Sequence, residues 1–457
     1  MSDFKGLRPF LQLLEKQGEL IRVKKEVKAK HELSAVLKIL IDQDGPAVLF
    51  EKVQGYNMPV VGNVFAARRR LLLSINTTQE RIFEEWGKRT SVPVSPKIVK
   101  SGPVKDIVLT GSSADIKRLP VPIHNLEDGG PYITAGVTAF RKPNGLTNMG
   151  LYRVYAGRDK VMIRSAPGGH LWFTVRKAEE ERRSVQAAII IGADPEVQLA
   201  AGASLPYDAD DMAVAGSLKE EPVEVVKCET VDAYVPANAE IVIEGEIVPS
   251  QQEKDGPFGD FAGYYQTASD PSVSIFKVTA ITHRKDAIFQ TLLPAYAEHF
   301  TIGTVPLEAR WFKSLREVVP TVKAVYRPPS SLGFLAIVSI KKTNEMQPRL
   351  AILSMLTSQR CKHVIIVDDD VNIFDLKDVQ FAISTRFQGD KDLITISNLQ
   401  GSALDPSSDP ARAGSTAKVG IDATKPLDKP YPKRIEWPKE VLDKAEAFLP
   451  ANYRKKS

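Results

Sequence analysis

The sequence lacks the features of secreted and membrane-spanning chains. It has only 2 cysteines in 457 residues, Cys228 and Cys361, and they do not form a CxxC pair. This scarcity excludes a disulfide framework and fits a reducing compartment. No stretch approaches the run of about 18 apolar residues that a membrane-spanning helix needs, and residues 1–6 lack the basic and then apolar pattern of a signal peptide. We therefore expect a cytoplasmic protein without a membrane span.

The sequence also has little excess charge. Its 61 lysine and arginine residues nearly balance its 56 acidic residues, which leaves a net charge of +5 for the whole chain. The densest basic clusters, at 68–70 and 454–456, are short and fit solvated surfaces better than a nucleic-acid-binding stripe. We expect a small-molecule partner rather than nucleic acid, in a chain long enough for two or three domains.

Hydrophobic periodicity divides the chain into units of different character. Residues 1–110 alternate helical and strand patterns and predict a small α/β unit. Residues 111–305 contain many strand-like runs, which predict a β-barrel or sandwich core. A linker helix with proline at its start is expected at 306–322, and residues 323–457 show the strand–helix alternation of βαβ units around a mostly parallel sheet. The predicted fold class is therefore mixed α/β (α+β).

Two polar segments stand out in the β-rich region. Segment 148–153 places Asn148 near one end of a strand and Arg153 at the other. The planar guanidinium of Arg153 suits a carboxylate or a phosphate, although a strand-edge arginine paired with a surface acid would show the same pattern. Segment 164–170 is a glycine-rich turn that ends in His170. Its backbone N–H groups could cradle an anion, and His170 could bind a metal or simply cap the turn.

Acidic residues are concentrated before an apolar helical run. Asp208, Asp210 and Asp211 could stabilise the start of that helix, or they could act as oxygen ligands for Mg²⁺ or Mn²⁺. A second acidic run, at 368–370, ends a predicted strand, and we interpret it as a polar strand-to-helix connection.

Segment 255–260 (DGPFGD) holds two carboxylates on a stiff turn. Pro257 fixes its own φ angle, and the two glycines permit backbone conformations that other residues avoid. Taken alone, the segment fits a solvated surface turn. It also fits a turn that directs Asp255 and Asp260 at a common target.

These segments, in this order, resemble the UbiD family of prenylated-FMN-dependent decarboxylases of the ubiquinone-biosynthesis type. The resemblance covers most of the chain. Each motif alone is weak, but their shared order is hard to obtain by chance. The motifs lie at 148–153, 192–195, 225–228, 235–237, 240–245, 256–260, 263–265, 367–372, 385–386 and 418–424.

The resemblance implies a split β-barrel domain at 111–305 that binds prenylated FMN, and an α/β domain at 323–457 that forms the oligomer contact. The family's cofactor contacts fall on the strand and on the glycine-rich turn. They are Asn148, Leu151, Tyr152, Arg153, Arg164, Ser165, Ala166, Gly169 and His170.

The resemblance also implies a divalent metal, usually Mn²⁺, that bridges the cofactor phosphate. The family's three ligands fall on Asn148, His170 and Asp211. The family's acid is commonly Glu, so Asp211 is a departure, and Asp210 is the alternative ligand. K⁺ is a further candidate ion.

The family's catalytic arginine and two acids fall on Arg153, Asp255 and Asp260. The first acid is often Glu in the family, so Asp255 is a second departure. Asp260 matches the residue that protonates the carbon after CO₂ leaves. Two neighbouring carboxylates do not ionise together easily, so Arg153 should favour the charged form of one and leave the other able to hold a proton. His299 either lines the substrate pocket or lies in a surface loop.

The function implied by the resemblance is the reversible non-oxidative decarboxylation of an aromatic, heteroaromatic or α,β-unsaturated carboxylic acid. A flavin prenyltransferase would supply the cofactor, and the protein would form a homodimer or a hexamer. Two alternatives stay open: a flavin-barrel oxidoreductase that uses ordinary FMN, and a catalytically inactive UbiD-like subunit.

Overall fold

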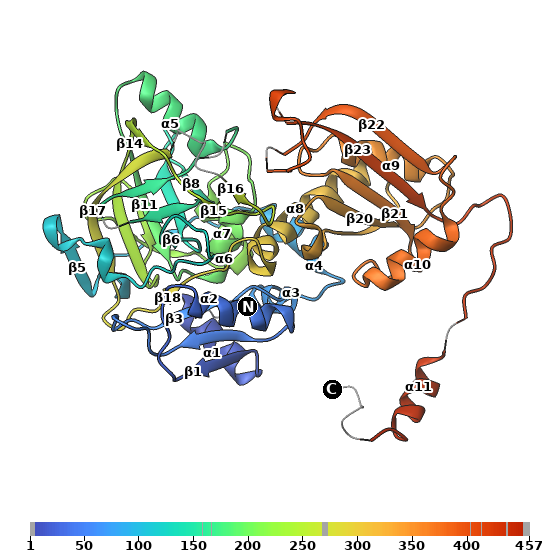
Figure 1. The fold of residues 1–457 in the computed structure, drawn as a ribbon, viewed down its shortest axis with the longest axis horizontal. Coiled ribbons are helices and arrows are strands. Elements are labelled where there is room, and N and C mark those ends of the chain that lie inside the picture. The colour runs from blue at the N-terminus through green and yellow to red at the C-terminus, as the bar shows by residue number, and fades with distance from the viewer. Residues whose placement is uncertain are drawn as a thin grey trace.

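Three units follow one another along the chain. The computed structural model describes residues 5–157, 159–165, 167–266, 273–402, 404–412, 414–435 and 437–450. Figure 1 shows an N-terminal α/β unit next to a β-rich unit, and a C-terminal α/β unit reached through the long helix α8 (Ala297–Val318). The predicted mixed α/β fold class is confirmed. Within the described residues, no helix is long and apolar enough to cross a membrane.

The N-terminal unit is a small sheet covered by helices. Its elements are α1 Leu7–Lys16, β1 Leu20–Val23, α2 Glu32–Asp42, β2 Ala47–Phe50, β3 Val60–Gly62, α3 Arg68–Ser74, α4 Ile82–Thr90 and β18 Phe289–Gln290. The strand order is β1-β2-β3-β18. The first helix ends at Lys16, just before Gly18, which adopts a φ of 72° that favours glycine. Since β18 comes from far along the chain, it ties this unit to the β-rich unit.

The β-rich unit is built around one antiparallel sheet of nine strands. They are β5 Ile107–Thr110, β6 Tyr132–Ile133, β7 Val137–Arg141, β8 Thr147–Leu151, β9 Val154–Ala156, β10 Val161–Ile163, β11 Val185–Ile191, β14 Ile241–Glu253 and β17 Val273–His283. The order is β6-β9-β10-β17-β14-β11-β7-β8, with β5 on β17. Two register shifts between β14 and β17 add local twist, which helps the sheet to curl into a half-barrel.

Strand β11 explains why this sheet is covered on both faces. Ala188 and Ile190 belong to one apolar core, whereas Ala187, Ile189 and Ile191 belong to another. Successive side chains of a strand point to opposite faces of the sheet. Apart from the exposed Gln186, β11 is apolar at every position, so both of its faces need to be covered.

Helices and two small sheets bring distant segments to β8. The helices are α5 His170–Glu180, α6 Pro195–Gly202 and α7 Asp211–Lys219. The small sheets contain β4 Lys97–Ile98, β12 Glu224–Lys227 and β13 Tyr234–Pro236, and then β15 Phe258–Gly259 and β16 Tyr265–Gln266. Helices α6 and α7 pack against each other and against β8. The start of α7 therefore lies beside the strand that carries Asn148.

Helix α8 corrects the prediction for the linker. The helix was expected to begin at Pro306, but it begins at Ala297 and contains Pro306 in its interior. An internal proline costs a helix about 3 kcal/mol or more. Burial compensates for this cost, because α8 buries Trp311 and Phe312 among many apolar residues, and each such side chain stabilises by about 1.5–3 kcal/mol. His299, for which a surface loop was one interpretation, lies in the first turn of this helix.

The C-terminal unit has a mixed sheet where a mostly parallel one was predicted. Its elements are β19 Val322–Tyr326, β20 Leu335–Ile340, α9 Gln347–Leu356, β21 His363–Asp368, α10 Leu376–Arg386, β22 Leu393–Gln400 and β23 Ser415–Ala423. Only β20, β21 and β23 pair in parallel, and the edge strands β19 and β22 pair antiparallel. No α-helix separates β19 from β20 or β22 from β23, and a parallel pair needs such a crossover.

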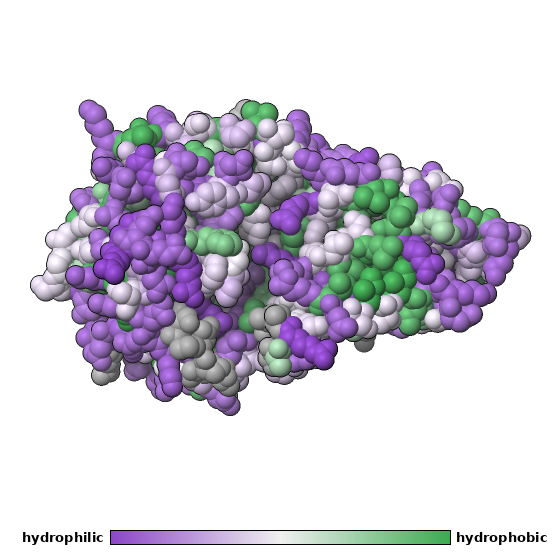
Figure 2. Space-filling model, turned by 90° about the horizontal axis from the view of Figure 1, so that it is seen from above, coloured by the Kyte–Doolittle hydropathy of each residue, from purple (hydrophilic) through white to green (hydrophobic). Residues whose placement is uncertain are grey.

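The C-terminal unit also exposes apolar side chains. Apolar residues gather over it in the view of Figure 2, and this unit exposes Leu350 and Leu353 on α9 and Leu393 on β22. Beyond it, Figure 1 shows the chain extending away to α11 (Lys439–Glu446), which buries none of its residues. This surface is larger than scattered single residues would give.

Candidate active site

Strand β8 and the two residues after it carry the polar side chains singled out in the sequence. Asn148 lies in the strand and is 1% exposed, because α6 and α7 cover it. Arg153 follows the end of the strand, and its side chain is 8% exposed. Two buried polar groups on one short segment require partners, and each finds them in a different cluster.

The first cluster brings together Asn148, His170 and Asp211, and we call it the Asn–His–Asp cluster. The amide Nδ2 of Asn148 lies 2.9 Å from His170 Nδ1 and donates to Asp211 Oδ2 at 3.2 Å. The backbone N–H of Met149 also donates to this carboxylate oxygen, at 2.7 Å. The three predicted metal ligands therefore meet, although they come from β8, the start of α5 and the start of α7.

The Asn–His–Asp cluster leaves two oxygen atoms unsatisfied. Asn148 Oδ1 and Asp211 Oδ1 are buried and accept no hydrogen bond from the described residues. The described chain contains no group of three His, Cys, Asp or Glu side chains placed to bind a metal, but here an amide supplies the third position. Two free oxygens beside an imidazole form a donor set suited to a divalent cation, so the residues fit such a group.

Burial dominates the electrostatics of this cluster. Burial raises the pKa of Asp211 to about 7, against the opposing effects of the Met149 N–H and the charge of Lys142. Burial also lowers the pKa of His170, and the charge of Lys142 adds to that effect. A buried carboxylate that resists ionisation becomes fully charged when a cation binds to it.

Asp210, the alternative predicted ligand, has a different task. It caps α7, and its Oδ1 accepts hydrogen bonds from the N–H groups of Met212 and Ala213, both at 3.0 Å. Its Oδ2 accepts from the N–H of Thr147 at 3.2 Å. Both oxygens are therefore engaged, and the geometry favours Asp211 over Asp210 as a ligand.

The second cluster brings together Arg153, Asp255 and Asp260, and we call it the Arg–Asp–Asp cluster. Arg153 Nη2 lies 2.5 Å from Asp255 Oδ2, and Arg153 Nη1 donates to Asp260 Oδ2 at 3.3 Å. Asp255 is 3% exposed, so the interpretation of segment 255–260 as a solvated turn is wrong. Strands β15 and β16 form a tight ribbon that holds the turn in place, and the turn points both carboxylates at one guanidinium.

Tyr132 is a member of this cluster that the sequence did not predict. Its hydroxyl donates to Asp255 Oδ1 at 2.7 Å. Burial, followed by the negative charge of Asp255, raises the pKa of Tyr132. The guanidinium carbon of Arg153 also lies 4.6 Å from the centre of the Phe258 ring, a cation–π contact that helps to hold the guanidinium in place. Arg153 Nε keeps no acceptor among the described residues.

Comparison with known proteins identifies the chain. Residues 11–90, 97–297 and 300–423 match, in turn, the N-terminal, Rift-related and C-terminal domains of the family described as 3-octaprenyl-4-hydroxybenzoate carboxy-lyase, UbiD. The chain belongs to the UbiD family. The predicted resemblance is therefore confirmed.

Similar proteins agree with this assignment. The anhydromevalonate phosphate decarboxylase of Methanothermobacter thermautotrophicus is 36% identical over 91% of this chain and 96% of its own length. The UbiD-class enzyme HmfF from Pelotomaculum thermopropionicum, solved in complex with FMN, is 37% identical, with a TM-score of 0.92 over 97% of this chain and 100% of that one. An evolved dimeric form of HmfF, in complex with prFMN, is 36% identical, with a TM-score of 0.87 over 98% of this chain and 100% of that one. This UbiD-family chain is therefore a decarboxylase, as predicted.

The other cofactor contacts predicted from the UbiD family surround the two clusters. Arg164 donates its N–H to the carbonyl of Arg153 at 3.1 Å, which holds the glycine-rich turn against the end of β8. Burial raises the pKa of Tyr152 to about 12. Leu151 and Ser165 are half-buried, Gly169 precedes α5 as its N-cap, and Ala166 lies outside the described residues.

His299 lies in an aromatic group beside Asp260. Its ring centre is 5.8 Å from that of Phe261, the residue after Asp260, and 6.0 Å from that of Phe300. The Phe261 ring also contacts Phe334 of the C-terminal unit, at 6.3 Å. Burial lowers the pKa of His299, while the charge of Asp260 opposes this effect. His299 therefore faces the Arg–Asp–Asp cluster from α8.

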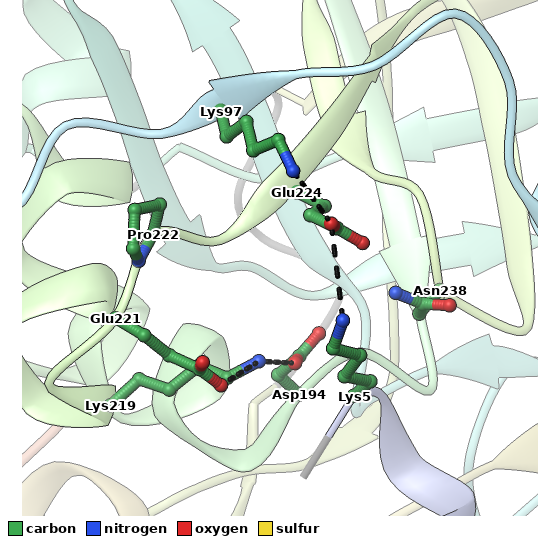
Figure 3. A pocket seen from close by; sticks show the side chains of 8 residues that line it. All are labelled: Lys5, Lys97, Asp194, Lys219, Glu221, Pro222, Glu224 and Asn238. Carbon is green, nitrogen blue, oxygen red and sulfur yellow. Dashed lines mark hydrogen bonds and ion pairs between the residues drawn. The ribbon is translucent and has the colours of Figure 1, made fainter. Parts of the chain in front are cut away.

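A separate cavity is lined by charged side chains that neutralise one another. It has a volume of about 190 Å³ and contains three lysines and three acids, which pair with one another. Figure 3 shows Lys219 between Asp194 and Glu221, at 2.9 and 3.6 Å, and Glu224 between two lysines. Its charges need no further partner, so this cavity is a weaker candidate for an active site than the two clusters.

Proposed function

We propose that this chain is a prenylated-FMN-dependent decarboxylase that acts reversibly and without oxidation on an aromatic, heteroaromatic or α,β-unsaturated carboxylic acid. One observation carries the proposal. A single short segment joins a cluster with unsatisfied oxygens to a cluster with two carboxylates on one arginine. The first suits a metal and an anionic cofactor end, and the second suits proton transfer at a substrate carbon.

Asn148, His170 and Asp211 would hold a divalent cation, for which Mn²⁺ is the proposed ion. Their free oxygens support this role, and the metal would hold the cofactor phosphate. When bound, prenylated FMN would serve as the electron sink for the carbanion that loss of CO₂ leaves behind.

Asp260 would donate the proton that replaces CO₂. It is the more accessible of the two acids, with its side chain 15% exposed against 1% for Asp255. Asp255 is held by Arg153 and by the Tyr132 hydroxyl, so its role would be to keep the guanidinium in place. Arg153 Nε, buried and without an acceptor in the described residues, would then be free to bind a carboxylate of the substrate or the cofactor.

The substrate would lie between the two clusters and the C-terminal unit. Rings from α8 and the C-terminal unit surround Phe261, and aromatic walls favour a flat conjugated acid. His299 would orient this acid: its Nδ1 accepts the Ala295 N–H at 3.3 Å, which leaves Nε2–H as its hydrogen-bond donor.

We also propose that the protein is a homodimer formed through the C-terminal unit. The exposed leucines of α9 and β22 support this arrangement. A flavin prenyltransferase of the host cell would supply the cofactor.

Co-expression with a flavin prenyltransferase tests the function. The purified protein should then have an absorbance spectrum distinct from that of protein loaded with ordinary FMN. It should release CO₂ from members of a panel of aromatic, heteroaromatic and enoic acids that includes anhydromevalonate phosphate, the substrate in the name of the Methanothermobacter relative. Reductase activity with ordinary FMN would favour the oxidoreductase alternative, and no turnover at all would favour an inactive subunit.

A further inference from the structure

Lys142 is a buried cation at the edge of the Asn–His–Asp cluster. It follows β7 in the hairpin that leads to β8, where its N–H donates to the carbonyl of Leu146 at 2.9 Å. The residue is 2% exposed. Its ammonium group donates to the carbonyl of Tyr207 at 2.6 Å and also to the carbonyl of Ala209. The ammonium therefore holds the segment that leads directly into Asp210 and Asp211.

The charge of Lys142 has no counterion among the described residues. Among the described residues, no carboxylate lies within 4.0 Å of its ammonium group, whereas the buried Lys219 is paired with Asp194 at 2.9 Å. A buried charge without a partner is costly. Neutral carbonyl groups solvate the ammonium, but they leave its full positive charge available to an anion nearby.

Two ring contacts connect the Lys142 ammonium group to the Asn–His–Asp cluster. The ammonium lies 5.3 Å from the centre of the Tyr207 ring, and this ring packs edge-on against His170 at 5.3 Å. The same charge acts on the pKa of both His170 and Asp211. Lys142 is thus part of the electrostatic environment of the cluster, although it belongs to no motif found in the sequence.

We propose that Lys142 is a positioning residue of this site. Its ammonium group binds the carbonyls of Tyr207 and Ala209, as a monovalent cation would, and thereby fixes the segment that carries Asp211. It also supplies positive charge to the anionic group that binds at the cluster. Backbone carbonyl oxygens also coordinate K⁺, so the ammonium takes a place that a potassium ion could otherwise occupy and makes the site independent of one. The inference rests on the proposed metal-ligand set.

Mn²⁺ binding tests the inference without an activity assay. EDTA-treated protein loaded with FMN is titrated with MnCl₂, and free Mn²⁺ is followed by electron paramagnetic resonance in Na⁺ buffer, with or without added K⁺ or Li⁺. The wild type should bind equally tightly in all three conditions. Lys142→Met should raise the Kd for Mn²⁺ by about 10–100-fold, as loss of a supporting partner does. Added K⁺, but not the smaller Li⁺, should recover much of this loss.

Two further variants separate positioning from folding. Lys418 is a matched control, because it is 1% exposed and its ammonium also donates to two carbonyls, those of Leu356 at 3.0 Å and Ser358 at 2.7 Å. Lys418→Met should lower the melting temperature and leave the Kd for Mn²⁺ unchanged. Lys142→Gln, which keeps an N–H donor without the charge, should reproduce the loss of affinity and its rescue by K⁺.

The outcomes distinguish the inference from the proposed function. If the wild type binds Mn²⁺ and both Lys142 variants bind it as tightly, the inference alone is overturned. A loss of affinity that K⁺ does not recover in either variant would also overturn it. If the wild type binds no Mn²⁺, the proposed ligand set is wrong, and this inference falls with it.

Discussion

The Asn–His–Asp cluster and the Arg–Asp–Asp cluster start from one strand end but differ in what they lack. In the Arg–Asp–Asp cluster, one guanidinium lies against two carboxylates, and the more buried carboxylate has a further donor in Tyr132. In the Asn–His–Asp cluster, two buried oxygens have no donor among the described residues. The polar groups of the Arg–Asp–Asp cluster are therefore nearly all paired within the protein, whereas the Asn–His–Asp cluster keeps two unpaired buried oxygens that a cation could bind. Under the proposed function, this means that the protein alone would supply the proton-transfer group, whereas the group that anchors the cofactor would be complete only with a bound cation.

Among variants that keep their cofactor, Asp260→Asn should have the largest effect on turnover. It should change only the Arg–Asp–Asp cluster. The variant keeps the size of the side chain but cannot donate the proton, so turnover should fall by about 10²–10⁴-fold, the usual contribution of a general acid. Cofactor and metal should still bind, because the Asn–His–Asp cluster is untouched. CO₂ release and the absorbance spectrum measure the two effects, and full activity would remove Asp260 from the role of proton donor.

Asp211→Asn and Asp210→Asn form a matched pair of variants that tests the Asn–His–Asp cluster. Asp211→Asn removes the only carboxylate with a free buried oxygen in the Asn–His–Asp cluster, so metal and flavin should be lost together. Asp210→Asn should retain both, since asparagine also caps helices well. Metal analysis and flavin fluorescence of the purified variants check this pair. The opposite pattern would make Asp210 the ligand.

Tyr132→Phe should weaken the Arg–Asp–Asp cluster by removing one of its hydrogen bonds. Asp255 would lose its second donor, and an unsatisfied buried acceptor costs about 1–3 kcal/mol of unfolding free energy. We expect this loss in urea unfolding, with a smaller decrease in turnover than for Asp260→Asn. Tyr155→Phe is the control, because Tyr155 packs against Tyr132 with ring centres 5.4 Å apart, yet its hydroxyl makes no hydrogen bond among the described residues. Equal losses in both variants would contradict the role of the hydroxyl.

His124→Gln should have the smallest effect and concerns stability alone. Burial lowers the pKa of His124 to about 3, and its Nε2 lies 2.8 Å from Thr291 Oγ1. The unfolded chain binds a proton at its ordinary pKa near 6.5, whereas the folded chain does not. The wild type should therefore lose up to about 1.4 kcal/mol per pH unit as the pH falls below that value. His124→Gln should show a flatter decrease in melting temperature between pH 6.5 and 4, with no such change in slope above pH 7.

Much of the fold followed from local patterns. The alternating cores of β11 and the end of α1 at Gly18 were predictable because each depends on a few neighbouring residues. The start of α8 was not, since only tertiary burial allows Pro306 inside a helix. The antiparallel edges of the C-terminal sheet also escaped prediction, because an overall alternation of strands and helices does not show where one strand follows another without a crossover helix.

The candidate site was also predictable only in part. The predicted metal ligands and catalytic residues came from sequence motifs, and the structure brings these residues together in two clusters. Tyr132 and Lys142 were missed because their partners lie far along the chain. Tyr132 donates to Asp255, and Lys142 donates to the carbonyls of Tyr207 and Ala209. The two departures from Glu to Asp also make sense only in three dimensions. Neighbouring groups reach both shorter side chains, namely the Met149 N–H for Asp211 and the Tyr132 hydroxyl for Asp255.

Under the proposed function, the segment from Asn148 to Arg153 would also limit the length of the ligand. Five residue steps span at most about 17 Å even when fully extended. A ligand that engages both ends must match this distance, with its anionic terminus at Asn148 and its reactive ring at Arg153. A flavin without its terminal phosphate would reach only one end, so the strand would select cofactors by length before any chemistry begins.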